Sequence, residues 1–151
     1  VKEGQNIAII TDAGTPGISD PGSVVVSKCI EENVAFEVLP GATAITTALV
    51  YSGLDTTKFL FRGFLSRENK YRNEVLDEIK DYRETIIFYE APHRLNSTLE
   101  YLKEKLGNRR IAICKEKLLG GEFSALLYSG IFDNISNSKG EINVLHNWKN
   151  I

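Results

Sequence analysis

The sequence predicts an α/β sheet protein, because short apolar runs alternate with longer segments of helical periodicity and most connections between them are short. The apolar runs have the length and composition of buried strands. We expect strands over residues 6–11, 36–39, 58–65, 85–89 and 109–114. We expect helices over residues 24–33, 42–53, 67–82 and 94–107.

Each predicted helix has a local reason. Pro21 and Gly22 precede Ser23, a favourable N-cap for the first helix, and Gly53 is a favourable C-cap for the second. The third is amphipathic and highly charged. The fourth places apolar side chains on one face at helical spacing, namely Leu95, Leu99, Leu102 and Leu106.

Composition indicates a soluble globular protein. The chain has 151 residues, 42% of them hydrophobic and 25% charged, which is enough for an ordinary core without metals or disulfides. Cys29 and Cys114 lie in apolar segments without C-x-x-C spacing, which predicts buried reduced thiols, no metal site and a cytoplasmic location. We see no signal peptide and no run long enough to cross a bilayer. The net charge of −2 means that any RNA contact requires a local basic patch.

The segment TDAGTPGISDPG, residues 11–22, follows the first predicted strand and contains three glycines. A loop at the carboxyl end of a parallel strand lies where α/β proteins bind ligands, and glycines let a ligand approach the backbone closely. Neither phosphate-loop pattern is present. The segment therefore indicates either a site for a small polar ligand or merely a tight turn.

Five segments, in this order and at this spacing, resemble motifs of the tetrapyrrole (corrin/porphyrin) methylase superfamily. The resemblance covers Lys2 to about Glu116 and is strongest to the bacterial branch that methylates the 2′-O of a cytidine ribose in small-subunit ribosomal RNA. The segments are DAGTPGISDPG, LPGATAITTALVYSGL, FRGFL, TIIFYEAPHRL and LGNRRIAICKE.

This resemblance implies a methyltransferase of two α/β domains that uses S-adenosylmethionine bound in the cleft between them. Residues 1–41 would be the last part of a first parallel α/β domain. Residues 42–151 would be a second α/β domain with a mixed sheet, divergent after about residue 117. The family's motif on its first strand has no counterpart here, so we expect a partial chain that lacks the N-terminal part.

The resemblance also implies which residues contact the cofactor. They would come from the first loop, from the domain junction and from the end of a later strand. Alternatively, Thr43 only caps a helix and Tyr89 only fills the core. The expected contacts are Asp12, Ala13, Gly14, Thr15, Ile18, Pro40, Gly41, Thr43, Ala44, Tyr89 and Glu90.

The turn EAPHRL carries the candidate catalytic residues, Glu90 and His93. Methyl transfer to a ribose hydroxyl requires help in removing the proton, and His93 is the candidate general base, or else a cap or surface residue. Arg94 is a candidate phosphate contact. A second basic cluster is either an RNA patch or a solvated helix face, and consists of Arg62, Arg67, Lys70 and Arg72.

We therefore expect a methyltransferase whose partners are ribosomal RNA in the small ribosomal subunit and a second copy in a homodimer. We expect no membrane and no metal partner. Two alternatives stay open: methylation of a tetrapyrrole precursor, and a noncatalytic remnant or dimerisation module.

Overall fold

The computed structural model describes residues 4–11, 14–19, 22–107, 109–118, 121–129 and 143–145, with the backbone alone described from residue 115 onward. The chain divides into two compact units, Val1–Ala44 and Ile45–Ile151. The predicted domain boundary after residue 41 lies three residues before this division and stays a prediction.

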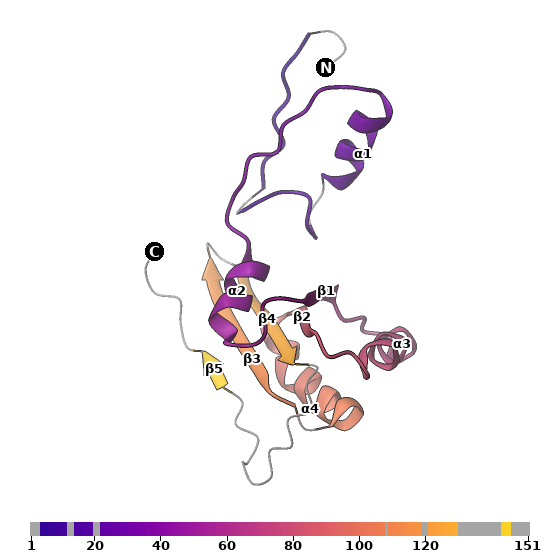
Figure 1. The fold of residues 1–151 in the computed structure, drawn as a ribbon, viewed down its shortest axis with the longest axis vertical. Coiled ribbons are helices and arrows are strands. Elements are labelled where there is room, and N and C mark those ends of the chain that lie inside the picture. The colour runs from indigo at the N-terminus through magenta and orange to yellow at the C-terminus, as the bar shows by residue number, and fades with distance from the viewer. Residues whose placement is uncertain are drawn as a thin grey trace. The chain divides into compact units, whose positions relative to one another are not determined.

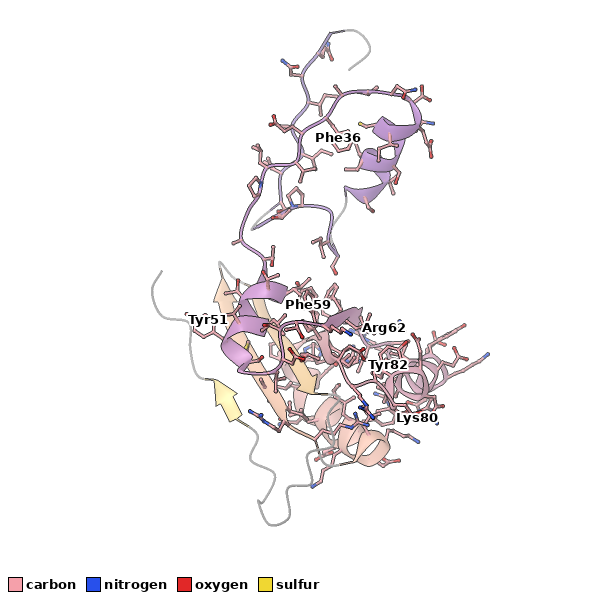
Figure 2. All side chains as sticks on the ribbon, viewed as in Figure 1. Phe36, Tyr51, Phe59, Arg62, Lys80 and Tyr82 are labelled. Carbon is pink, nitrogen blue, oxygen red and sulfur yellow. The ribbon has the colours of Figure 1, made fainter. Side chains whose placement is uncertain are left out.

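The first unit has one described helix, α1 (Ser23–Glu31), whose N-cap is Gly22 rather than the predicted Ser23. The strands predicted over residues 6–11 and 36–39 are wrong, since both segments are extended but no strand forms among the described residues of this unit. A strand requires a hydrogen-bonded neighbour, which an apolar run cannot supply by itself. Their apolar side chains are correspondingly exposed, including Ile10 and Phe36, the latter labelled in Figure 2.

The second unit is built on a five-stranded sheet of order β1-β2-β4-β3-β5 (Figure 1). β1 pairs with β2 in parallel, and β3 pairs with β5 in parallel. β4 lies between β2 and β3 and is antiparallel to both. The predicted α/β class and mixed sheet are thereby confirmed, as are the last three predicted strands. The strands are β1 (Phe59–Phe64), β2 (Thr85–Glu90), β3 (Ile111–Leu118), β4 (Gly121–Ser129) and β5 (Asn143–Leu145).

Two helices cover one face of this sheet, α3 (Asn69–Ile79) and α4 (Leu95–Leu106), with a short 3-10 turn, η1 (Pro92–Arg94), leading into α4. Ile86 and Phe88 of β2 are fully buried against them. The predicted apolar face of α4 is confirmed: two of its leucines belong to this core and two pack against it. The 3.6-residue period of the helix places all four toward the sheet.

The opposite face of the sheet is covered by α2 (Ala44–Ser52), which crosses it in Figure 1. The Cys114 thiol of β3 donates a hydrogen bond of 3.7 Å to the carbonyl oxygen of Ala48. Burial raises the pKa of this thiol above its usual value. Both cysteines are free, as predicted, although Cys29 is only half-buried.

β1, at the edge of the sheet, contains a β-bulge. Phe61 lies opposite Ile87 and Phe64 lies opposite Tyr89, so β1 uses one residue more than β2 over this stretch. Gly63 occupies the bulge with φ +63°, a conformation that side chains other than glycine's rarely adopt.

Candidate functional site

Two loops that the sequence singled out meet in the first unit. The amide of Thr15 donates to the carbonyl oxygen of Ala42 at 3.1 Å. The hydroxyl of Thr15 donates to the carbonyl oxygen of Gly41 at 3.1 Å and accepts from the amide of Gly41 at 3.0 Å. One threonine thus holds two chain segments 26 residues apart. We call residues 14–15 and 41–42 the glycine contact.

This contact requires glycine at position 14 and leaves little room for a side chain at position 41. A Cβ on Gly14 would stand 2.4 Å from the carbonyl oxygen of Ala42, and φ there is +78°. A Cβ on Gly41 would stand 3.2 Å from both the amide nitrogen and the hydroxyl oxygen of Thr15. The backbones therefore approach this closely because Gly14 has no side chain, and glycine at position 41 avoids a further tight contact.

Three of the predicted cofactor residues, Gly14, Thr15 and Gly41, are thus brought together by direct contact. Ile18 is exposed in the same loop, and Asp12 and Ala13 lie outside the described residues. The junction residues Pro40, Thr43 and Ala44 flank Gly41–Ala42 along the chain. Tyr89 and Glu90 belong to the second unit and are described with it.

Glu90 ends β2 with a carboxylate that is only 1% exposed. One oxygen accepts the amide of Ala91 at 2.8 Å and forms an ion pair with Nε of Arg94 at 3.4 Å. The other accepts the hydroxyl of Thr98 on α4 at 2.7 Å. A buried carboxylate is stable only with such partners, so Glu90 ties the strand end, the η1 turn and α4 together.

The guanidinium of Arg94 also donates to the carbonyl oxygen of Leu65, at 3.2 Å, so it links η1 to the residue after β1. His93, beside it on η1, is exposed. The turn EAPHRL therefore holds its glutamate and arginine inside a hydrogen-bonded network and presents its histidine to solvent. The catalytic and RNA-binding roles expected of these three residues stay predictions.

The four basic residues predicted as an RNA patch differ in their surroundings. Arg62 forms a two-pronged ion pair with Glu78 of α3, with distances of 3.2 and 2.8 Å. Arg72 stacks over the ring of Tyr101, its guanidinium carbon 3.6 Å from the ring centroid. Arg67 and Lys70 are exposed. Arg62 and Arg72 thus contact other elements of the fold, whereas the exposed Lys70 lies only over the ring of its neighbour Tyr71, with its Nζ 5.8 Å from the centroid.

Sequence reasoning did not single out an aromatic cluster at the carboxyl end of β1 and β2. The ring of Tyr89 contacts Phe61 edge-on, with centroids 4.8 Å apart, and Phe64 at 5.5 Å. The glycine inside FRGF was the available sign, because a glycine within a strand pattern indicates a bulge.

Metal ligation finds no support in the described part of the chain, where no group of three or more histidine, cysteine, aspartate or glutamate side chains could hold an ion. No helix among the described residues is long and apolar enough to cross a membrane.

Comparison with known proteins identifies the family. Residues 1–123 match the family of tetrapyrrole (corrin/porphyrin) methylases. Three relatives each carry the name ribosomal RNA small subunit methyltransferase I. The one from Halalkalibacterium halodurans is 50% identical over 76% of this chain and 39% of its own length. The one from Synechocystis is 51% identical over 73% of this chain and 39% of its own length. The one from Haemophilus influenzae is 38% identical over 94% of this chain and 52% of its own length.

The chain thus spans between two fifths and about half of the length of these relatives. The match runs through both loops of the glycine contact and through the EAPHRL turn, the segments on which the resemblance was based. The chain belongs to the tetrapyrrole (corrin/porphyrin) methylase family.

Proposed function

We propose that this chain belongs to an S-adenosylmethionine-dependent methyltransferase that modifies the 2′-O of a cytidine ribose in small-subunit ribosomal RNA. The observation that carries the proposal is the identity of 38–51% to relatives named as ribosomal RNA small subunit methyltransferases. Membership of a methylase family supports the same reaction class.

The glycine contact fits a cofactor site. It holds two glycine-bearing loops together through Thr15, and backbone groups next to glycines can approach a ligand closely. In our proposal the loop from Asp12 to Ile18 holds the methionine end of the cofactor, and the junction from Pro40 to Ala44 contributes further contacts. When bound, S-adenosylmethionine supplies the methyl group.

In this proposal His93 is the general base that removes the ribose proton. Its imidazole is exposed, so it can contact a substrate that binds at the surface of the protein. Glu90 acts as a positioning residue, since both of its oxygens are bonded within the turn. Tyr89, buried beside Glu90, shapes the same strand end. The proposal thus separates a solvent-facing base from the buried network that holds its turn.

Ribosomal RNA binding is proposed for the basic residues, chiefly the exposed Arg67 and Lys70, with Arg62, Arg72 and Arg94 as contributors beside their structural contacts. Such patches are needed because a net charge of −2 provides no general attraction to phosphate. We further propose a homodimer that works in the cytoplasm, where ribosomal subunits are assembled.

The test measures transfer of a labelled methyl group to small ribosomal subunits that lack the modification, with uroporphyrinogen as the competing substrate. Thr15→Val, which removes both hydroxyl hydrogen bonds of the glycine contact, should weaken cofactor binding, and Thr15→Ser, which keeps the hydroxyl, should preserve it. Transfer to uroporphyrinogen would support the tetrapyrrole alternative instead. Transfer to neither substrate would support a noncatalytic role.

A further inference from the structure

Phe64, at the carboxyl end of β1, presents a large aromatic surface. Its side chain is 54% exposed, whereas Tyr89 beneath it is 7% exposed. The two rings are tilted by 54° with centroids 5.5 Å apart. Tyr89 is in turn held by Phe61, edge-on at 69°. An exposed ring thus rests on a buried one, which fixes its position before any ligand arrives.

The β-bulge creates this arrangement. In a regular strand, residues three apart point to opposite faces. Here Phe61 and Phe64 lie opposite Ile87 and Tyr89, which share one face of β2, so both phenylalanines lie on that face. Gly63, with its positive φ, makes the extra residue possible.

Two exposed basic residues follow this ring in the sequence, and a third, Arg94, which is ion-paired with Glu90, contacts the backbone beside it. The carbonyl oxygen of Leu65, the next residue, accepts a hydrogen bond from the guanidinium of Arg94. Arg67, three residues after Phe64, is exposed, and so is Lys70 in the first turn of α3. An exposed aromatic ring followed by cations has the chemistry that recognises a single-stranded nucleic acid, whose bases stack while its phosphates pair with the cations.

We propose that Phe64 is a stacking platform for one unpaired nucleobase of the RNA substrate, with Tyr89 and Phe61 as its support and Arg67, three residues further along the chain, as a contact to an adjoining phosphate. This inference rests on the proposed function, because it specifies how the same protein recognises RNA. It assigns the substrate a base that is splayed out of its helix.

The chain provides its own matched control. Phe59 lies on the same strand and, by its pairing with Thr85, on the same face, and it is 43% exposed. Phe59 is the first residue of β1 and Phe64 the last, and Phe59 is labelled in Figure 2. Replacing either phenylalanine by leucine removes one partly exposed ring from β1. Only the replacement of Phe64 should weaken RNA binding.

The experiment uses the 151-residue chain and a single-stranded RNA containing the fluorescent base 2-aminopurine, whose emission falls when it stacks. We expect Phe64→Leu to weaken RNA binding roughly 10-fold and to abolish the quenching, and Phe64→Trp to retain both. Phe59→Leu should leave both unchanged. The salt dependence of binding should be the same in all variants, because no charge is altered.

Equal effects of Phe64→Leu and Phe59→Leu would overturn the inference, and so would unchanged RNA binding by Phe64→Leu. A loss confined to cofactor affinity, measured separately by calorimetry, would assign the ring to the cofactor's adenine instead and also overturn it. If Phe64→Leu fails to fold, ultraviolet crosslinking of the unaltered chain to RNA decides, because the crosslinked peptide must contain Phe64. An unaltered chain that binds no RNA would refute the proposed function itself.

Discussion

Gly14→Ala tests the glycine contact most directly. The added Cβ would stand 2.4 Å from the carbonyl oxygen of Ala42, whereas Cβ atoms essentially never come nearer than 3.0 Å. The obstacle is a backbone atom, which cannot swing aside as a side chain would. The loops must therefore separate, and the hydrogen bonds that Thr15 makes to Gly41 and Ala42 lengthen or break.

The size of the effect follows from two contributions. Alanine at φ +78° is strained by about 1 kcal/mol. Each hydrogen bond of Thr15 contributes about 0.5 kcal/mol at a solvent-exposed contact such as this one. We expect Gly14→Ala to destabilise the closed arrangement of the two loops by about 2–3 kcal/mol and to weaken cofactor binding in proportion.

Gly4→Ala is the matched control, because Gly4 lies in the same unit with φ +77° and has no atom within 4 Å of an added Cβ. Gly4→Ala should therefore show only the backbone strain of alanine at a positive φ, without a steric clash. Amide hydrogen exchange followed by NMR reads the contact directly, since the Thr15 amide should lose protection in Gly14→Ala and keep it in Gly4→Ala. Unchanged protection in Gly14→Ala, or equal loss in both variants, would refute the reasoning.

Three further predictions concern the second unit. Thr98→Val should lower the free energy of unfolding by about 1–3 kcal/mol, because the buried Glu90 carboxylate loses a donor, and denaturant unfolding measures the loss. Arg62→Gln should lower the melting temperature slightly at low salt but not at high salt, since it removes the charge that pairs with Glu78 at the surface. Burial raises the pKa of Cys114, so stability should fall as pH rises above the usual thiol value, and Cys114→Ala should remove that part of the fall; an identical pH profile would contradict the assignment.

Much of the second unit could be predicted from sequence because its elements carry strong local patterns. The run TIIFYE is apolar from Ile86 to Tyr89, and β2 is buried on both faces as a central strand should be. The leucines of α4 follow a period of 3.6 residues, and they pack where that period places them. By contrast, the apolar runs before residue 11 and after residue 35 carried a similar pattern without forming strands, because pairing is a property of neighbours and not of a segment.

The candidate site divides in the same way. The sequence by itself determined the family, the glycine-bearing loops and the EAPHRL turn, because residue types at fixed spacing are enough to identify them. Only the tertiary structure decided that Thr15 joins the two loops, that Glu90 is buried within its turn, and that a bulge brings Phe64 onto Tyr89. Each of these depends on which atoms lie within hydrogen-bonding or van der Waals distance across 8 to 26 residues of chain, and local pattern carries no information about that distance.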